Sequence, residues 1–173
     1  PDAMNPTPRA LAFDIFGTVV DWHGSIVREV NQRHPQVDAN ALALAWRSGY
    51  QPAMQRVRSG ELGWTLIDDL HRMVLDGLLP TFGLTHLGED ERDHLNRVWH
   101  RLDPWPDTVA GLTRLKTRHT LCTLSNGNLG LLTNMAKRAG LPWDAILGAE
   151  LARAYKRDPR AYLNTAEILG LPP

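Results

Sequence analysis

Residues Arg9 to Thr18 have the sequence Arg-Ala-Leu-Ala-Phe-Asp-Ile-Phe-Gly-Thr, a short apolar run that leads into an aspartate. The apolar run has the length of a buried strand, and Gly17 permits a tight turn soon after it. The sequence therefore predicts a strand over Arg9–Phe13 that delivers the carboxylate of Asp14 to a loop.

The pattern changes to helical periodicity after Asp21. One face of a predicted helix carries five apolar residues: Leu66, Leu70, Met73, Val74 and Leu78. Further helices are predicted over Ser25–His34, Ala39–Arg58 and Glu89–Arg101. The first predicted strand is therefore followed by an all-helical block.

Strand and helix signals return after this block. Residues 103–106 have the sequence Asp-Pro-Trp-Pro, which forbids helix before each proline, and Asp107 suits the N-cap of a following helix. The apolar stripe of that helix is expected to be Val109, Leu112 and Leu115. Two more strands are predicted, over His119–Leu124 and Ala145–Leu147.

Two helices are predicted in this last part of the chain. The first has an apolar face of Leu131, Leu132, Met135 and Ala139, and it is closed by Gly140. The second begins with Asp158 as N-cap and Pro159 as first helical residue, and it ends at Gly170.

The order of these elements predicts an α/β fold: a Rossmann-like parallel sheet with helices on both faces and an inserted all-helical cap subdomain. The core is expected to comprise residues 8–20 and 104–173, and the cap residues 21–103. Ligands of such sheets bind beyond the carboxyl ends of the strands. Asp14, Ser125 and the loop before Lys156 are expected at that edge.

The composition excludes several classes of protein. The chain has 173 residues, 22% of them charged, and a formal net charge of zero, so no basic surface for nucleic acid or anionic membranes is expected. Its apolar runs are too short to span a bilayer. Cys122 is the only cysteine, and the histidines lack metal-ligand spacing, so neither disulfides nor a metal site is predicted. A cytoplasmic location is expected.

Three short motifs occur in the order found in one enzyme superfamily. They are Phe-Asp-Ile-Phe-Gly-Thr at 13–18 with Asp21 after it, Leu-Ser-Asn-Gly at 124–127, and Tyr-Lys-Arg-Asp-Pro at 155–159. Together with the helical insert after the first motif, they resemble the haloacid dehalogenase superfamily. The resemblance covers the chain from about Ala10 to Leu171 and implies that superfamily's core fold.

Phe16 separates the subtypes of this superfamily. Its phosphatases carry a second aspartate two positions after the nucleophile, which protonates a leaving alkoxide. Phe16 occupies this position here. Halide is a very weak base and leaves without a proton, so the sequence is similar to that of the hydrolytic L-2-haloacid (type II) dehalogenases.

A second resemblance lies in the predicted cap. Leu-Ala-Trp-Arg at 44–47, with Tyr50 one turn later, resembles the segment in which these dehalogenases carry a substrate-site arginine. The substrate brings a carboxylate and releases a halide, and a guanidinium suits either anion.

The resemblance implies a role for each of these residues. Asp14 would attack the halogen-bearing carbon, and water would hydrolyse the resulting aspartyl ester to a 2-hydroxy acid. Lys156 would keep Asp14 ionised, and Thr18, Ser125 and Asn126 would hold carboxylate and substrate oxygens. Arg47 would bind the substrate, and Tyr162 would support the site. The expected pocket wall consists of aromatic residues: Phe16, Trp22, Tyr50 and Trp64.

The chain departs from the family pattern in two places. Arg157 replaces the proline of the third motif. The family also continues with a strand and loop that carry asparagine and aspartate residues, whereas this sequence stops at residues 170–173. We therefore expect that the sequence is truncated before the fourth motif.

Two alternatives remain open from the sequence. One is a phosphatase of the same superfamily, which would require Mg²⁺; the dehalogenase requires no cofactor. The other is a catalytically incompetent remnant that binds small carboxylates or a partner. The resemblance also implies a homodimer, and no nucleic-acid or membrane partner is expected.

Overall fold

Two parallel strands carry the site loops in the computed structural model, which describes residues 7–172. Strand β1 (Ala10–Phe13) pairs with β4 (Thr120–Thr123), with Ala10 opposite Thr120 and Phe13 opposite Thr123. Their carboxyl ends therefore lie side by side, and Asp14 and Leu124 follow directly. The parallel α/β arrangement predicted from the sequence is confirmed.

The third predicted strand, Ala145–Leu147, is wrong. The segment runs beside β4 but forms only isolated bridges, Cys122 with Ala145 and Ser125 with Gly148. The Thr123 hydroxyl donates to the carbonyl oxygen of Leu147 at 2.7 Å and accepts from its N–H at 2.8 Å. A side chain thus occupies the backbone groups that a regular ladder would use.

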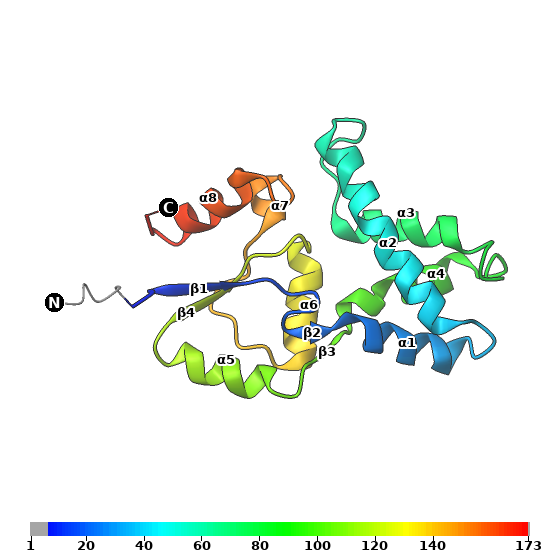
Figure 1. Cartoon of the computed structure of the whole chain (residues 1–173), viewed down its shortest axis with the longest axis horizontal. Helices are drawn as coiled ribbons and strands as arrows, with labels where there is room; N and C mark the ends of the chain where they lie inside the picture. Colours follow the sequence, from blue (N-terminus) through cyan, green and yellow to red (C-terminus); the bar gives the residue numbers. More distant parts are fainter. Residues whose placement is uncertain (1–6, 173) are drawn as a thin grey trace.

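Four helices accompany the strands: α5 (Thr108–Lys116), α6 (Leu129–Ala139), α7 (Ala149–Ala152) and α8 (Pro159–Ile168). Figure 1 shows α5 and α8 on opposite sides of the strand pair. Gly140 ends α6 in the left-handed conformation that glycine adopts without strain, as predicted. The Asp158 carboxylate caps α8 by accepting from the N–H of Arg160. Asp107 occupies the N-cap of α5 but makes no side-chain capping hydrogen bond.

The segment between β1 and α5 is helical: α1 (Trp22–Arg33), α2 (Ala39–Arg58), α3 (Ile67–Leu78), α4 (Glu89–Asn96) and the 3₁₀ helix η1 (Arg97–His100). Helix α1 begins three residues before the predicted Ser25, because the Asp21 carboxylate caps it by accepting from the N–H of Gly24. The buried face of α3 consists of Ile67, Leu70, His71 and Leu75. Met73, expected on that face, is exposed.

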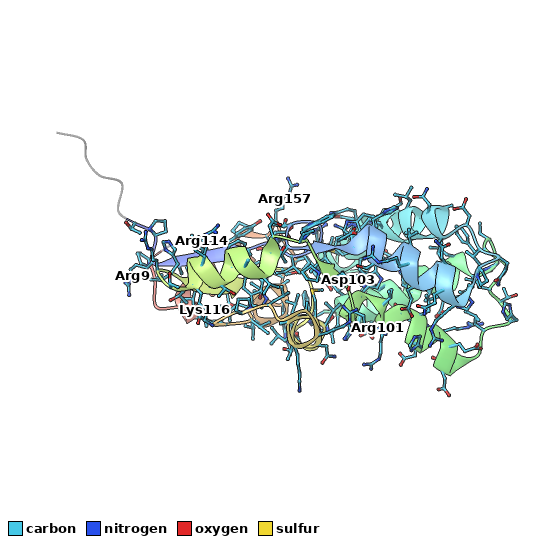
Figure 2. The ribbon with its side chains drawn as sticks, turned by 90° about the horizontal axis from the view of Figure 1, so that it is seen from below. Arg9, Arg101, Asp103, Arg114, Lys116 and Arg157 are labelled. Carbon is cyan, nitrogen blue, oxygen red and sulfur yellow. The ribbon has the colours of Figure 1, made fainter. Side chains whose placement is uncertain are left out.

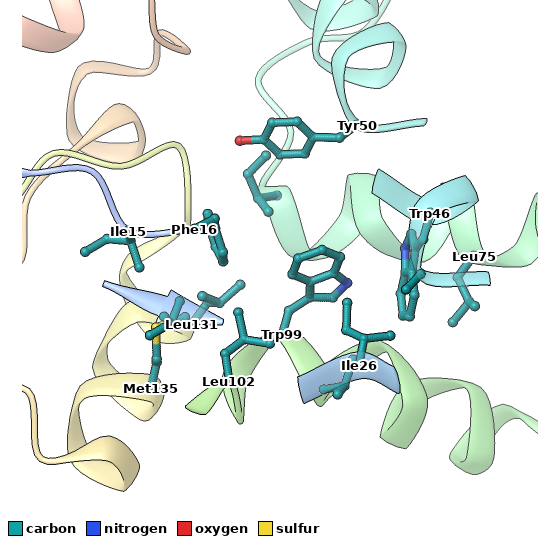
Figure 3. Close-up of a cluster of buried hydrophobic side chains, with 14 of the residues drawn as sticks. Ile15, Phe16, Ile26, Trp46, Tyr50, Leu75, Trp99, Leu102, Leu131 and Met135 are labelled. Atoms are coloured by element: carbon teal, nitrogen blue, oxygen red, sulfur yellow. The ribbon is translucent and has the colours of Figure 1, made fainter. Parts of the chain in front are cut away.

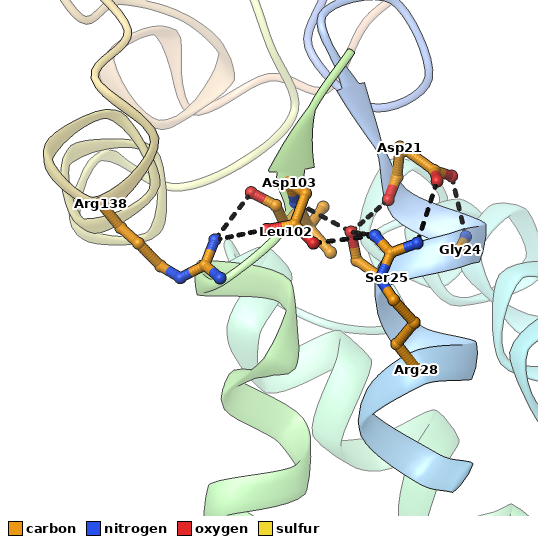
Figure 4. Close-up of polar contacts among 7 residues, drawn as sticks. All are labelled: Asp21, Gly24, Ser25, Arg28, Leu102, Asp103 and Arg138. Carbon is orange, nitrogen blue, oxygen red and sulfur yellow. Dashed lines mark hydrogen bonds and ion pairs between the residues drawn. The ribbon is translucent and has the colours of Figure 1, made fainter. Parts of the chain in front are cut away.

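A short antiparallel ribbon joins the helical part to the strands. Strand β2 (Val20–Asp21) pairs with β3 (Asp103–Pro104), where the chain leaves and re-enters the strand-containing part. Asp103 accepts hydrogen bonds from Arg28 of α1 at 2.8 Å and from Arg138 of α6 at 2.9 Å (Figure 4). Asp103 thereby links β3 to helices α1 and α6. The predicted domain boundaries fall in this ribbon, and Pro173, the last residue of the predicted core, lies outside the described residues.

A buried aromatic cluster fills the junction between the two parts. Phe16 lies edge-on to Trp99, with ring centroids 5.8 Å apart (Figure 3). Trp99 in turn stacks on His71 at 4.2 Å. The indole N–H of Trp46 donates to the backbone carbonyl of His71 at 2.9 Å. The loop after β1 therefore shares one apolar core with the helical part.

A polar network crosses the same junction. The Asp68 carboxylate of α3 lies 2.9 Å from His100 Nε2 and accepts from the Asn128 side chain of the other part at 2.9 Å. Burial raises the pKa of the Asp68 carboxyl, but its hydrogen bonds with His100 and Asn128 outweigh burial and leave the pKa below its ordinary value. Asp68 is therefore charged at neutral pH.

Within residues 7–172, no helix combines the length and apolar character needed to cross a membrane.

Candidate active site

A carboxylate–lysine pair lies at the carboxyl ends of β1 and β4. Lys156 Nζ is 3.0 Å from Asp14 Oδ1 and also donates to the carbonyl oxygen of Leu124 at 2.9 Å. Thr18 Oγ1 donates to Asp14 Oδ2 at 2.8 Å. The Asp14 side chain is 49% exposed and that of Lys156 is 18% exposed, so solutes can reach the carboxylate. The predicted proximity of Asp14, Thr18 and Lys156 is present.

The loop after β4 places its two polar residues differently. Asn126 Oδ1 accepts from the backbone N–H of Lys156 at 2.7 Å, and its Nδ2 lies 3.5 Å from Met54 Sδ of α2. Asn126 therefore positions the lysine loop. Ser125 is fully buried, and its hydroxyl accepts from the N–H of Gly127 at 3.0 Å. The Ser125 hydroxyl therefore closes the turn, and its role toward the carboxylate stays a prediction.

These groups open into a cavity of about 290 Å³ between the two parts of the chain. Its wall is formed by Asp14, Phe16, Arg47, Tyr50, Gln51, Asn126, Lys156, Arg157 and Tyr162. Three cations therefore face one carboxylate. A pocket with this charge suits a small anion that lies against Asp14.

Arg47 reaches this cavity from α2 and lies on aromatic rings. Its guanidinium carbon is 4.3 Å from the Tyr50 ring centroid and 5.5 Å from that of Trp22. Its Nη1 is buried and has no hydrogen-bond partner among residues 7–172. A buried charged donor without a partner is costly, so an anion at this point would stabilise the arrangement.

Two of the aromatic residues expected in the wall lie elsewhere. Trp22 lies against Arg47 and stacks on Trp99 at 6.2 Å, so it positions the arginine and is not part of the described cavity wall. Trp64 packs on Tyr155 at 4.7 Å and lines a different cavity. Sequence spacing identifies an aromatic residue but does not give the direction of its side chain.

Phe16 and Tyr50, which were expected in the wall, line the cavity, and Tyr162, which was expected to support the site, lines it as well. Burial, opposed in part by Asn126 and by the charge of Arg47, raises the pKa of the Tyr50 phenol. The Tyr50 hydroxyl is therefore neutral at physiological pH and can donate a hydrogen bond. Tyr162 is much more exposed than Tyr50 and lies at the rim.

Three residues of the site were not predicted. Gln51 and Arg157 line the cavity, and each directly follows a predicted residue, so adjacency was the available signal. His71 lies behind the wall, edge-on to Phe16 with ring centroids 6.4 Å apart. Burial lowers the pKa of His71 to about 3, so its ring is neutral at physiological pH. Helical spacing was the available signal, because His71 lies three residues before Val74 on the apolar face of α3.

Residues 7–172 contain no group of three or more His, Cys, Asp or Glu side chains placed to hold a metal ion. The polar groups of the cavity wall include one carboxylate, three cations and two phenol hydroxyls.

The chain is similar to known proteins over nearly its whole length. The family model for haloacid dehalogenase-like hydrolases matches residues 8–173. (S)-2-haloacid dehalogenase 4A of Burkholderia cepacia is 29% identical in an alignment of 175 residues. The alignment covers 95% of this chain and 71% of that protein.

Two solved structures are more similar in sequence. The L-2-haloacid dehalogenase PA0810 is 44% identical with a TM-score of 0.92, and the match covers 96% of this chain and 73% of that one. The defluorinating L-2-haloacid dehalogenase Rha0230 is 48% identical with a TM-score of 0.91, and the match covers 96% and 70%.

Proposed function

Because the chain belongs to the haloacid dehalogenase-like hydrolase family, we propose that it removes halide from short-chain L-2-haloacids by hydrolysis, with Asp14 as the covalent nucleophile. The activity is that of a hydrolase acting on carbon–halide bonds, of the (S)-2-haloacid dehalogenase type. Residues 21–103 serve as the cap in this proposal, and residues 8–20 and 104–173 as the catalytic core.

One observation carries the choice of reaction. Asp14 is held between Lys156 and Thr18, and Phe16 occupies the place where a phosphatase of the family has its general acid. An alkoxide leaving group needs a proton, whereas halide does not. The site therefore supports displacement of halide from carbon better than hydrolysis of a phosphate ester.

The proposed reaction has two steps. A carboxylate oxygen of Asp14 attacks the halogen-bearing carbon; the new carbon–oxygen bond forms as the carbon–halogen bond breaks, and halide leaves with the electron pair. Water then adds to the carbonyl carbon of the aspartyl ester. The bond between that carbon and the product oxygen breaks, the product oxygen takes one proton of the water, and the other proton passes to solvent. The carboxylate of Asp14 is thereby regenerated and a 2-hydroxy acid of inverted configuration leaves.

The other wall residues have binding roles in this proposal. Arg47 presents a buried guanidinium nitrogen without a partner among residues 7–172, which suits the substrate carboxylate or the departing halide. Asn126 and Tyr50 offer hydrogen-bond donors beside it, Phe16 supplies apolar wall, and Tyr162 closes the rim. Trp22 holds Arg47 in place, and Ser125 acts through the turn that carries Asn126.

The proposed reaction uses neither a metal ion nor a cofactor, because the leaving group is stable as an anion. Its partner is a small 2-haloacid. The homodimer implied by the resemblance and the cytoplasmic location expected from the composition stay predictions; size-exclusion chromatography with light scattering tests the first.

Halide release tests the proposal directly. The purified chain with excess chelator is expected to release chloride from (S)-2-chloropropionate, and Asp14→Asn is expected to lower the rate at least about a thousandfold. In a single turnover in ¹⁸O-labelled water, the label is expected in Asp14 and not in the product. Phosphate release from a phosphomonoester with Mg²⁺, without halide release, would overturn the assignment.

A further inference from the structure

A second cavity adjoins the candidate active site, between the end of α2 and the loop that precedes α8. Its volume is about 370 Å³, against about 290 Å³ for the cavity at Asp14. It is lined by Val57, Arg58, Trp64, Arg153, Ala154, Tyr155, Arg157, Asp158 and Arg160, and is called the arginine pocket below. Arg157 lines both cavities, so the two spaces share a wall.

The arginine pocket concentrates positive charge in a chain whose net charge is zero. Four arginines line it together with one acid, Asp158, which is already held by Arg160 at 2.8 Å. Arg58 donates to the backbone carbonyl of Lys156, which fixes its guanidinium at the wall. The side chain of Arg157 points away from the backbone (Figure 2), so a solute can reach it from solvent. Guanidinium groups in this number favour a carboxylate or similar anion.

Apolar and aromatic side chains supply the rest of the wall: Val57, Ala154, Trp64 and Tyr155. Trp64 and Tyr155 pack with ring centroids 4.7 Å apart and planes inclined by 34°. The Tyr155 hydroxyl donates to the backbone carbonyl of Thr65, so this ring is fixed in place. Binding sites for small molecules typically combine such apolar walls with a few polar groups that orient the ligand.

We propose that the arginine pocket is a second ligand site, which binds a carboxylate with a flat apolar body and communicates with the cavity at Asp14 through Arg157. The arginines bind the carboxylate, and Trp64, whose ring packs on the buried Tyr155, contacts the apolar body. The site itself does not depend on the proposed dehalogenation; only the consequence for haloacid binding rests on it.

Calorimetric titration of benzoate tests the site. The titrated protein is Arg47→Gln, in which the cavity at Asp14 has lost its own anion-binding arginine. Saturable binding of benzoate is expected, with no binding of the uncharged benzamide. Adding Arg153→Asn and Arg160→Gln is expected to weaken benzoate binding about fivefold. Asn tolerates the left-handed backbone of Arg153, whose φ is 48°, so the fold is expected to survive.

Two matched variants complete the titration. Arg153→Lys with Arg160→Lys keeps both charges and is expected to retain most of the affinity. Arg114→Gln with Arg118→Gln removes two charges elsewhere and is expected to leave benzoate binding unchanged. Arg114 lies in the last turn of α5 (Figure 2), and Arg118 follows that helix in the sequence. The site is excluded if benzoate fails to bind. It is equally excluded if the Arg114/Arg118 variant weakens binding as much as the pocket variant.

Communication through Arg157 is tested by binding, so that it can be decided without turnover. The affinity of Asp14→Asn for 2-chloropropionate is measured at increasing benzoate. Two coupled sites give an apparent Kd that changes and then reaches a plateau. A Kd that rises linearly without limit means one shared site and overturns the coupling. Absence of 2-chloropropionate binding would count against the proposed function, while the benzoate titration would still decide the arginine pocket.

Discussion

Two features distinguish Arg47 from Lys156 and Arg157, the other cations that line the cavity. Its guanidinium lies 4.3 Å from the Tyr50 ring centroid, and one of its nitrogens is buried without a partner among the described residues. Lysine in its place keeps the charge but loses the planar fork and the stacking on the ring.

Arg47→Lys is therefore expected to lower kcat/KM for (S)-2-chloropropionate about tenfold to a hundredfold, the size expected for one lost hydrogen bond to a charged group. Steady-state kinetics measure this effect, and thermal unfolding is the control, with Tm expected to change little. An unchanged kcat/KM would mean that another group binds the substrate carboxylate.

Single residues show where sequence reasoning succeeds and where it stops. Asp14, Thr18 and Lys156 could be assigned because motif position determines the end of a strand, and strand ends converge in a parallel sheet. Ser125 and Trp22 could not be placed. A hydroxyl in a turn can hydrogen-bond to a backbone amide or to a ligand. Which of the two it binds depends on the local backbone geometry, and motif position does not specify that geometry.

At the scale of elements, the segment Ala145–Gly148 is held against β4 by a close backbone approach. A Cβ built on Gly148 would lie 2.2 Å from the carbonyl oxygen of Ser125, and its φ is 150°. The turn that carries Asn126 therefore requires glycine at this position.

Gly148→Ala is expected to destabilise the fold by more than about 2 kcal/mol, because the backbone of the turn has to move. Gly111→Ala is the matched control: this glycine lies inside α5 with nothing within 4 Å of a built Cβ. It is expected to stabilise the chain by about 0.5–1 kcal/mol. Urea unfolding measures both. Equal effects of the two substitutions would contradict this account of the turn.

Helices were predicted better than short strands. Asp158, Pro159 and Gly140 mark helix ends through local capping, which sequence alone specifies. The strand expected at Ala145–Leu147 fails because the Thr123 hydroxyl binds both backbone groups of Leu147. The apolar pattern of the segment is that of a strand, and it contains no sign of this competing contact.

For the whole molecule, acid sensitivity follows from His71, which is buried in the junction. Its pKa is lowered to about 3 by burial, against about 6.5 in an unfolded chain. Between these values the unfolded chain binds a proton that the folded chain does not. The stability contributed by neutral His71 is therefore complete above about pH 6.5 and is lost as pH falls toward 3.

His71→Phe is expected to remove this dependence, of up to about 1.4 kcal/mol per pH unit, while the ring still stacks on Trp99. Urea unfolding of both proteins between pH 4 and pH 7 measures the two slopes. His86→Gln, at an exposed position, serves as control and is expected to keep the slope of the unmodified chain. Parallel curves for the unmodified chain and His71→Phe would contradict the prediction.

The general arrangement of the molecule could be predicted, but its second cavity could not. Alternation of strands and helices specifies a parallel sheet, and the helical insert follows from periodicity. The arginine pocket joins Arg58 to residues 153–160, which are far apart in the chain. Their proximity depends on how the helical part packs on the strands, and no local pattern encodes that.

The ribbon of β2 and β3 has a consequence for how such molecules can diversify. Asp21 and Asp103 are paired neighbours, so the insert starts and finishes at nearly one point. A cassette of different length or shape could be exchanged there without moving the ends of β1 and β4. Exchange of the helical insert, which contributes Arg47 and Tyr50, could then change substrate specificity, while the residues around Asp14 stay the same.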